Sequence, residues 1–344
     1  MLSLVAAAES MTIADSSVES FDVSIVIVSF NTREVLRECL ESVERESADL
    51  RVEVLVVDNN SSDGSPEMIE REFPGVRLFR SDVNLGFASA NNVALEVVRG
   101  RYPVLLNSDA FLRPGALALA VRHMDENPDV GLAGARLVGR DDSWQPSARM
   151  FPSLTTDLFV MTGLAGKFPK SRLFGKFDRT WADPLEACEC DWVPGAFSII
   201  RAEALKKAGL FDPEFFLYSE EVDLCRRIRE AGYRIMYWPD VVVTHIGGES
   251  SRQVKSLEMS KAGAQLVLWR MRSTLLYYRK HHGWAAWGAK MLETGLYRLV
   301  VLRNSFSNDP RRQARVREHR KLIAIMDQAW QDTQGGRVSP PRPW

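Results

Sequence analysis

The chain has 344 residues, of which 45% are hydrophobic and 26% are charged. This composition excludes a disordered chain, a collagen-like repeat and a disulfide-stapled small domain, and the length suits one large domain with an appendage or two domains. The near-neutral net charge conceals a division, because residues 1–250 carry 26 basic and 39 acidic side chains whereas residues 251–344 carry 18 and 6.

The first 21 residues are expected to form a flexible N-terminus. They lack the basic start and the long apolar run of a signal peptide, and no stretch of the chain reaches the roughly 20 apolar residues that a membrane-spanning helix needs. The four cysteines are too few and too scattered for a disulfide framework. These features favour a cytoplasmic protein, either soluble or held at a membrane surface.

Apolar, β-branched segments alternate with helical patterns in the first third of the chain. Strands are predicted at 23–29, 52–57, 76–80 and 102–106, and helices at 32–46, 65–73 and 88–99. Continuous apolar runs are typical of strands buried on both faces of a parallel sheet. The alternation therefore predicts an α/β fold with a mainly parallel sheet flanked by helices.

Polar clusters follow three of these predicted strands. They are Ser29-Phe30-Asn31, Asp58-Asn59-Asn60 and Asn107-Ser108-Asp109. Each cluster alone has a structural explanation as a helix cap or a turn. Ligands of parallel α/β sheets bind in the crevice beyond the carboxyl ends of the strands. The three clusters together therefore favour one binding crevice.

The second half of the chain is less regular before it returns to the same alternation. Residues 139–190, rich in Pro, Gly, basic and aromatic residues, are predicted to be a long, partly ordered excursion that carries specificity. Further elements are predicted as a strand at 191–200, a helix at 202–208, a helix that follows the acidic turn 219–223 and ends at Gly232, and a strand from 234 to 245.

The basic C-terminal quarter is predicted to be helical from 265 to 280 and from 284 to 302. Its mixture of basic, aromatic and leucine side chains is typical of interfacial helices, and anionic lipid attracts such a segment by about 1 kcal/mol per well-placed Lys or Arg. We expect residues 264–303 to contact an anionic membrane surface, with packing on the body as the alternative. Nucleic acid is disfavoured as a partner because the acidic body would repel it. Residues 330–344 are predicted to be a disordered tail.

Seven segments, in this order and spacing, carry a family signature. They are 24–31, 56–64, 84–92, 105–109, 192–197, 215–227 and His245. Over about residues 22–282 the chain resembles family 2 glycosyltransferases of the GT-A fold, in particular bacterial rhamnosyltransferases of cell-surface polysaccharide assembly. The resemblance implies a catalytic domain at 22–250, with a nucleotide-sugar-binding half at 22–110 and an acceptor-binding half at 111–250, and a basic helical region at 251–329.

The resemblance also implies an inverting transfer from a nucleotide-diphosphate sugar, with dTDP-rhamnose preferred, to a glycan or polyprenyl-diphosphate-linked acceptor. The expected location is cytoplasmic, peripheral at the inner face of the cell membrane. A catalytically silent nucleotide-sugar-binding or scaffold protein is the alternative from another class. A nucleotidyltransferase is disfavoured because residues 29–32 contain no Gly-rich phosphate loop.

A divalent cation, Mn²⁺ or Mg²⁺, is the implied cofactor. Such ions prefer carboxylate, phosphate and water oxygens, and Mn²⁺ also accepts imidazole. The family's Asp-x-Asp motif is here Asn107-Ser108-Asp109, so the resemblance implies Asp109 as the direct ligand and Asn107 as a partner of the ribose or of a metal-bound water. His245 resembles the histidine that completes the metal site, although a core histidine is the alternative.

The resemblance assigns further residues to the nucleotide sugar and the acceptor. Asp58 matches the aspartate that hydrogen-bonds the pyrimidine base. The other implied donor-binding residues are Ser29, Phe30, Asn31, Asn84, Gly86 and Asn91, and many relatives carry Arg at the position of Asn91. Trp192 and the bend at Gly195 are candidates for an acceptor-sugar platform, with a core role for Trp192 as the alternative.

The acidic turn supplies the implied catalytic base. An acceptor hydroxyl attacks the anomeric carbon, and a carboxylate that takes its proton contributes about 10²–10⁴-fold. Glu221 occupies the place of the aspartate that acts as the catalytic base in the family, and its side chain is one methylene longer. Glu220 and Asp223 are expected to orient the acceptor or hold the loop. The structural alternative is that Ser219 caps the helix and the acidic residues favour its dipole.

Overall fold

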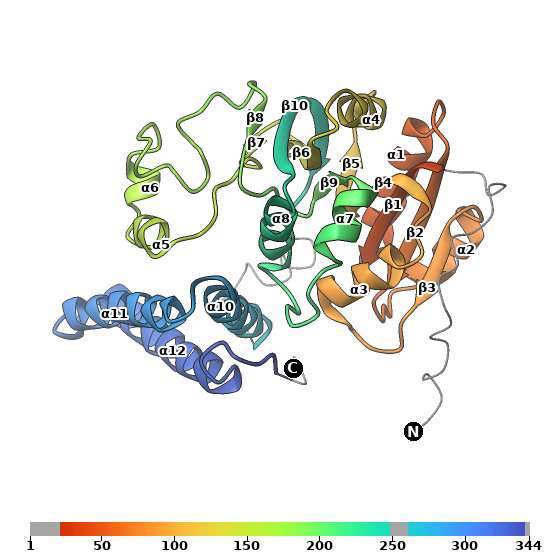
Figure 1. Ribbon diagram of the computed structural model, residues 1–344. Coiled ribbons are helices and arrows are strands. Elements are labelled where there is room, and N and C mark those ends of the chain that lie inside the picture. Colours follow the sequence, from red (N-terminus) through yellow and green to blue (C-terminus); the bar gives the residue numbers. More distant parts are fainter. Residues whose placement is uncertain (1–20, 248–260, 341–344) are drawn as a thin grey trace.

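The computed structural model describes residues 21–247 and 261–340. Figure 1 shows an α/β body and three long C-terminal helices beside it. Of the predicted flexible N-terminus, residues 1–20 lie outside the described residues, as does the expected boundary between body and appendage at 250. None of the described helices is long and apolar enough to cross a membrane.

Within residues 21–247, ten strands form a single mixed sheet. Its main path runs β3 (Arg77–Arg80), β2 (Val52–Asp58), β1 (Phe21–Ser29), β4 (Gly100–Asn107), β9 (Phe197–Ile200), β6 (Val130–Val138), β10 (Arg234–His245) and β5 (Ala110–Leu112). The first four strands are parallel to one another, β9 is antiparallel to both neighbours, and β6 is parallel to β10. The predicted α/β sheet with mainly parallel strands is confirmed.

Helices cover both faces of this sheet. The first face carries α1 (Arg33–Glu46), α2 (Ser65–Glu72) and α4 (Ala116–Glu126), and the second carries α3 (Gly86–Leu95), α7 (Ala202–Ala208) and α8 (Glu220–Glu230). Val23, Ile25 and Ile27 of β1 join the first buried cluster, whereas Val26 joins the second. Burial on both faces is the reason that β1 is a continuous apolar run.

The excursion at 139–190 holds more regular structure than expected. It contains β7 (Trp144–Gln145), which pairs with β6, β8 (Cys188–Glu189), which pairs with β10, and the helices α5 (Leu154–Met161) and α6 (Leu164–Lys167). A capping box begins α5, because the Thr156 amide donates to Ser153 Oγ and the Ser153 amide donates to the Thr156 hydroxyl. The predicted strand at 191–200 is shorter, since β9 begins at Phe197.

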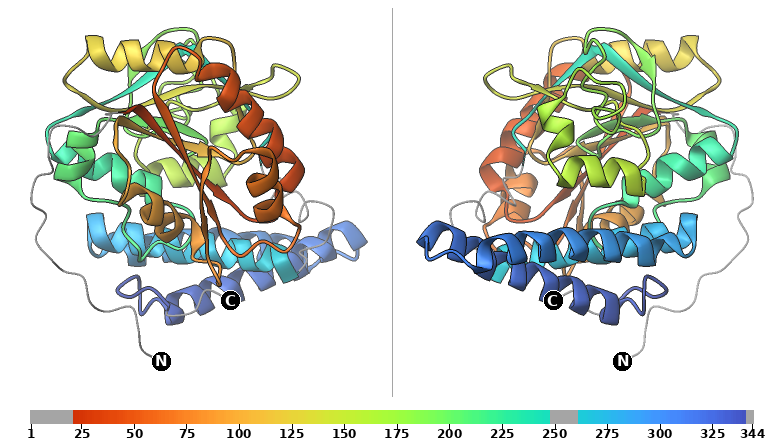
Figure 2. Two further views of the ribbon diagram at one scale, coloured as in Figure 1. Left: turned by 90° about the vertical axis from the view of Figure 1, so that its right-hand side faces the viewer. Right: turned by 90° about the vertical axis from the view of Figure 1, so that its left-hand side faces the viewer.

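The C-terminal quarter consists of α10 (Lys261–His282), α11 (Ala285–Ser305) and α12 (Pro310–Asp332), which lie side by side below the body (Figures 1 and 2). α10 packs on the body. Its Trp269 ring lies 4.4 Å from the Phe216 ring, and the Ser273 hydroxyl donates to the Leu217 carbonyl. For α10 these contacts favour the alternative of packing on the body, because Trp269, Met271, Leu275 and Leu276 are buried against the protein.

The chain stays ordered beyond residue 330, where the disordered tail was predicted to begin. α12 continues to Asp332, which pairs with Arg272, and the turns that follow return to α10. A Cβ at Gly336, where φ is 82°, would lie 2.3 Å from the Leu275 carbonyl oxygen. This glycine therefore serves close packing, and the expectation of disorder from 330 is wrong for residues 330–340. Residues 341–344 lie outside the described residues.

Candidate functional site

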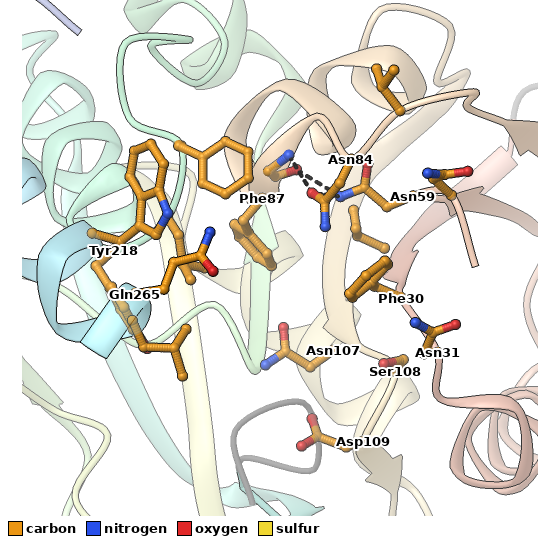
Figure 3. Close-up of a pocket in the computed structure, with 18 of the residues that line it drawn as sticks. Phe30, Asn31, Asn59, Asn84, Phe87, Asn107, Ser108, Asp109, Tyr218 and Gln265 are labelled. Atoms are coloured by element: carbon orange, nitrogen blue, oxygen red, sulfur yellow. Dashed lines mark hydrogen bonds between the residues drawn. The ribbon is translucent and has the colours of Figure 1, made fainter. Parts of the chain in front are cut away.

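A cavity of about 1120 Å³ lies at the carboxyl ends of β1, β2 and β4 (Figure 3). All three predicted polar clusters contribute to its wall, through Phe30 and Asn31, Asn59 and Asn60, and Asn107 to Asp109. The structure thus brings together side chains that are separated by up to 79 positions in the sequence. The size is suitable for an organic ligand larger than a single sugar.

The turns after β1 and β2 hold each other in place. Asn31 has a left-handed backbone with φ of 53°, its amide donates to Ser61 Oγ at 2.9 Å, and its Oδ1 accepts from the Ser62 amide at 2.8 Å. The neighbouring Phe30 turns its ring toward the cavity (Figure 3). Fixing these turns presents one aromatic ring and several amides to the same space.

Asp58, the last residue of β2, is buried behind these turns. Its Oδ2 accepts from the Ser61 amide at 3.0 Å, while Oδ1 has no hydrogen-bond partner among the described residues. A buried carboxylate oxygen without a donor is costly, so such an atom points to a donor supplied by a ligand. The following Asn59 and Asn60 line the cavity, whereas Asp58 itself is not among the lining residues. Its Oδ1 is therefore one residue away from that wall and lacks a donor among the described residues.

Asn59, Asn84 and Gly86 form a hydrogen-bond network in the cavity wall, and Figure 3 shows Asn59 and Asn84 side by side. Asn59 Nδ2 donates to Asn84 Oδ1 at 3.0 Å and to the Gly86 carbonyl at 3.2 Å, and the Gly86 amide donates to Asn84 Oδ1 at 2.9 Å. Gly86 has φ of 77°, and a Cβ there would lie 2.3 Å from the Phe216 carbonyl oxygen. Gly86 therefore lets α3 approach the loop that precedes α8.

Gly86→Ala is expected to destabilise the protein by about 1–3 kcal/mol, because the added methyl group meets backbone and the positive φ disfavours a side chain. Urea unfolding measures the change as a lower midpoint at an unchanged m-value. Gly75→Ala is the matched control, since nothing lies within 4 Å of a Cβ at that position. Equal midpoints for the two variants would contradict the close approach at Gly86.

Asp109 and His245 lie together at one side of the cavity. Pairing of β10 with β5 places His245 opposite Ala110, and His245 Nε2 is 3.5 Å from Asp109 Oδ1. Gln145 holds the histidine from behind, because its Oε1 lies 2.9 Å from His245 Nδ1 and its Nε2 donates to the His245 carbonyl at 2.8 Å. With Nδ1 donating to Gln145, the Nε2 lone pair faces Asp109.

The Asp109 carboxylate and the His245 imidazole could supply two ligands to a hard divalent cation. A carboxylate, an imidazole and a second-shell amide that fixes the imidazole are typical of such sites. No group of three His, Cys, Asp or Glu side chains suited to a metal occurs in the described ranges. A cation held by Asp109 and His245 would therefore complete its shell with ligand or water oxygens.

A strained turn leads into the acidic residues of α8. Tyr218 and Ser219 both have left-handed backbones, with φ of 72° and 69°, and Tyr218 lines the cavity. Two consecutive non-glycine residues in this conformation store strain, which clusters at functional sites. Ser219 makes no capping hydrogen bond through its side chain. The simple helix-cap alternative for this turn is therefore wrong.

Glu220, which is buried, and Glu221, which is half-buried, begin α8 directly after the cavity-lining Tyr218, and neither of them lines the cavity itself. In each, Oε2 has no hydrogen-bond partner among the described residues. Burial raises the pKa of Glu220, and repulsion from Glu221 adds to this rise. Burial also raises the pKa of Glu221, but its own backbone amide and the charge of Arg149 oppose the rise. A backbone amide opposes the rise in Glu220 as well, but only Glu221 gains from a nearby positive charge, so the pKa of Glu220 is raised further than that of Glu221.

Asp223, in the same first turn of α8, has a structural role. Burial by itself would raise its pKa, but hydrogen bonds from His281 and Lys280 and the charge of Arg227 lower the pKa to about 2. His281 Nε2 lies 2.7 Å from Asp223 Oδ1 and Lys280 Nζ lies 2.8 Å from it. Asp223 thus ties α8 to α10, as expected of a residue that holds the loop.

Trp192 and Asn91 are among the predicted contact residues that do not line the cavity. Trp192 is buried, its indole N–H donates to the Met150 carbonyl, and the Arg149 guanidinium covers its ring at 5.0 Å from the centroid. An open sugar platform at Trp192 is therefore wrong, and the core alternative is correct. Asn91 is also buried, and its Nδ2 donates to the Phe87 carbonyl one helical turn earlier.

Ser29 and Gly195 support the cavity from outside its wall. Ser29 is fully buried, and its hydroxyl lies 3.1 Å from the Thr32 hydroxyl. A Cβ at Gly195 would lie 3.1 Å from Cζ of Phe87, which lines the cavity. Neither Ser29 nor Gly195 is therefore placed for direct contact with a ligand in the cavity.

One wall of the cavity was not predicted from the sequence. It is formed by Gln265, Leu266 and Trp269 of α10, and Figure 3 shows Gln265 beside Tyr218, across the cavity from Phe30 and Asn31. The basic and aromatic pattern of α10 had indicated a membrane surface instead. Gln145 was also missed, because a two-residue strand inside an irregular segment leaves no periodic signal. The pairing of Phe216 with Trp269 has no local signature either.

Comparison with known proteins shows the family to which the sequence is similar. A family model described as "Glycosyl transferase family 2" matches residues 24–207, more than half of the chain. The N-acetylglucosaminyl-diphospho-decaprenol L-rhamnosyltransferase of Mycobacterium tuberculosis H37Rv is 26% identical over 314 residues, which is 86% of this chain and 98% of that protein. Rhamnosyltransferase WbbL of Escherichia coli K12 is 25% identical over 269 residues, or 74% and 92% of the two chains.

A solved structure supports the fold. The mannosyltransferase PcManGT from Pyrobaculum calidifontis, in complex with GDP-Man and Mn²⁺, superimposes with a TM-score of 0.56 over 92% of this chain and 88% of that chain. The two sequences share 17% identity. This likeness, together with the sheet and helices described above, confirms the expected GT-A fold.

Proposed function

The chain belongs to glycosyltransferase family 2, and we propose that it moves rhamnose from dTDP-rhamnose to a polyprenyl-diphosphate-linked glycan, with inversion at the anomeric carbon. One observation carries the proposal. A single cavity joins the turn beside Asp58, whose Oδ1 lacks a donor, to the Asp109–His245 pair. A base-binding group and a diphosphate-binding group in one cavity match the two ends of a nucleotide-diphosphate sugar.

The Asp58 end of the cavity suits a pyrimidine. The N3–H of thymine or uracil is a hydrogen-bond donor that Asp58 Oδ1 lacks among its described neighbours, and Phe30 offers a ring on which the base can pack. The preference for dTDP-rhamnose over other pyrimidine donors is supported by the names of the two relatives, both rhamnosyltransferases.

Asp58→Ala is expected to weaken dTDP binding by about 10–100-fold, because a hydrogen bond to a charged group is lost. Isothermal titration calorimetry of the purified chain with dTDP measures the change. Asp63→Ala is the control: its carboxylate also accepts from turn amides, but both of its oxygens already have donors, Oδ2 from the Arg33 amide and Oδ1 from the Ser65 amide. Equal affinities in the wild type and in Asp58→Ala would contradict the base-binding role.

The opposite end suits the diphosphate and a divalent cation. Asp109 and His245 would hold Mn²⁺ or Mg²⁺, and Gln145 would keep the imidazole in the required tautomer. When bound, the cation neutralises the negative charge that develops on the departing diphosphate. Asn107, which also lines the cavity, replaces the first carboxylate of the family motif and can donate to the ribose.

The transfer itself requires a base on the acceptor side. The acceptor hydroxyl approaches beside Tyr218 and gives its proton to Glu221 as its oxygen bonds to the anomeric carbon. The bond from that carbon to the diphosphate breaks on the opposite face, and the nucleoside diphosphate leaves with the electron pair. The neutral Glu220 beside it would donate to the acceptor. The hydrophobic surroundings keep the pKa of Glu221 raised and thus strengthen it as a base.

The acceptor and the location follow from the same reasoning. The first-named relative is described as acting on N-acetylglucosaminyl-diphospho-decaprenol, which supports a polyprenyl-diphosphate-linked acceptor for this chain. Such a lipid resides in a membrane, and a nucleotide-sugar donor is cytoplasmic. We therefore propose that the protein works at the inner face of the cell membrane.

A donor panel tests this proposal. The purified chain is incubated with Mn²⁺ or Mg²⁺, an N-acetylglucosaminyl-diphospho-polyprenol, and in turn dTDP-rhamnose, UDP-N-acetylglucosamine and GDP-mannose. We expect a rhamnosylated lipid with dTDP-rhamnose alone. Binding of dTDP without release of nucleoside diphosphate from any donor would contradict the proposal and favour the catalytically silent alternative, which Asn107 and Glu221 motivate as departures from the family motifs.

A further inference from the structure

α11 turns an apolar stripe toward solvent instead of toward the protein. Along the helix and its two caps, six large apolar side chains are between 42% and 88% exposed, and they form what we call the outer stripe: Trp284, Trp287, Met291, Leu299, Leu302 and Phe306. At 100° per residue these positions fall on one side of the helix. Solitary exposed apolar residues are ordinary, but a contiguous stripe of this length marks an interaction surface.

The inward face of α11 is already fully used. Ala286 and Ala289 pack against Tyr278 of α10 and Leu154 of α5, and Glu293 pairs with Arg270 of α10. α12 packs along a third side (Figure 2). The outer stripe is what remains, and no part of residues 21–247 or 261–340 covers it.

The exposed charges on α11 itself are all positive. The exposed charged residues of α11 are Arg298 and Arg303, while its single carboxylate, that of Glu293, is buried in an ion pair. The first turns of α12, which follow directly, expose Arg311, Arg312 and Arg315. Asp309 is engaged as the cap of α12, where it accepts from the Arg311 amide. At 100° per residue Arg298 falls within the outer stripe, so apolar and cationic groups are combined on that face of α11.

We propose that the outer stripe and these arginines dock the protein on an anionic lipid bilayer. Tryptophan, leucine and phenylalanine side chains would enter the headgroup and acyl boundary, while guanidinium groups pair with lipid phosphates. A second copy of the chain is the poorer occupant, because joining two such faces would bring arginines of like charge together. The inference deepens the proposed function, since it rests on a lipid-linked acceptor for its purpose.

The docking surface has a direct connection to the cavity. α10 contributes Gln265, Leu266 and Trp269 to the cavity wall and joins α11 through the turn at Gly283. α8, which carries Glu220 and Glu221, is tied to the end of α10 by the Asp223–His281 contact. A bilayer bound along α11 would therefore hold the acidic turn at a fixed position relative to the surface on which a lipid-linked acceptor resides.

Vesicle sedimentation with the full chain tests the docking. We expect binding to vesicles of phosphatidylcholine with phosphatidylglycerol, weaker binding to phosphatidylcholine alone, and loss of affinity as salt is raised. Trp284→Ser/Trp287→Ser should weaken binding by about tenfold or more, because two aromatic side chains lose their apolar contact. Leu185→Ser is the matched control, since Leu185 is 62% exposed in another part of the chain and should have no effect.

Two further variants keep the outcome decisive. Arg311→Gln/Arg312→Gln, at exposed positions, should lower binding and its salt dependence. Trp284→Phe/Trp287→Phe should keep binding but lose part of the fluorescence quenching by brominated acyl chains. Failure of the wild type to bind anionic vesicles, or equal binding by Trp284→Ser/Trp287→Ser, would overturn the docking. A dimer in light scattering that Trp284→Ser/Trp287→Ser dissociates, without vesicle binding, would likewise overturn it.

Calorimetric titration with dTDP, without vesicles, separates this inference from the proposed function. Intact dTDP binding together with absent vesicle binding would remove the docking surface alone. Vesicle binding without transfer from any donor would leave the docking surface and remove the proposed activity.

Discussion

Glu221→Gln is expected to lower the rate constant of transfer by about 10²–10⁴-fold, because glutamine cannot take the proton of the acceptor hydroxyl. The affinity for dTDP should not change, since Glu221 is not among the residues that line the cavity. Rates of nucleoside diphosphate release at saturating donor and acceptor measure the first effect. Calorimetric titration with dTDP measures the second.

Glu220→Gln is the matched control for this variant. Glu220 keeps its proton to higher pH than Glu221, so a neutral amide of the same shape replaces a neutral acid. We therefore expect a much smaller loss of rate in Glu220→Gln. Wild-type transfer by Glu221→Gln, or a larger loss in Glu220→Gln, would remove Glu221 as the base.

The pH dependence of transfer should reflect the same pair. Burial raises the pKa of Glu221 above its ordinary value of 4.5, so the charged form that accepts a proton is lost as the pH falls through the raised pKa. The acidic limb of kcat/KM is thus expected above pH 4.5. The limb should be missing from the residual activity of Glu221→Gln. Its persistence there at the same pH would assign the limb to another group.

Asp109→Ala is expected to lower metal-dependent transfer by about 10²-fold or more, because the direct carboxylate ligand is lost and the departing diphosphate is less well neutralised. Mn²⁺ titration in the presence of dTDP, followed by electron paramagnetic resonance, measures the loss of metal affinity independently of turnover. Asn107→Asp makes the reciprocal control. It restores the first carboxylate of the family motif, so Mn²⁺ should bind more tightly than to the wild type.

Wild-type Mn²⁺ affinity in Asp109→Ala would contradict the metal site. Gln145→Ala gives an intermediate case, because it removes only the amide that fixes the His245 tautomer. Outer-shell changes of this kind cost about 10–100-fold in metal affinity. A loss in Gln145→Ala as large as that in Asp109→Ala would indicate that the variant had disturbed β7 instead.

The sequence was sufficient for the parts of the site that are local to strand ends. β1, β2 and β4 are continuous apolar runs, and each stops at a polar cluster, so the position of Asp58 and Asp109 follows from the period of the strands and the rule for parallel sheets. The acidic turn before α8 was also visible, since its charges and aromatic residues are consecutive.

The rest of the site depends on contacts between distant segments. Gln145 and His245 are 100 positions apart, and Trp269 meets Phe216 across 53 positions. Neither pair leaves a periodic pattern, and α10 has the composition of an interfacial helix although the body covers it. Trp192 shows the reverse error, because an aromatic residue beside a Pro-Gly bend resembled a sugar platform whereas Arg149 closes its face.

We propose that this chain is an inverting, metal-dependent glycosyltransferase. The anomeric configuration of the first product can be determined by nuclear magnetic resonance after reaction of dTDP-rhamnose with an N-acetylglucosaminyl-diphospho-polyprenol and Mn²⁺. We expect a rhamnosyl linkage with the configuration opposite to that of the donor, formed by the wild type and not by Glu221→Gln. A product of retained configuration, or no glycosylated product from a protein that binds dTDP, would contradict it.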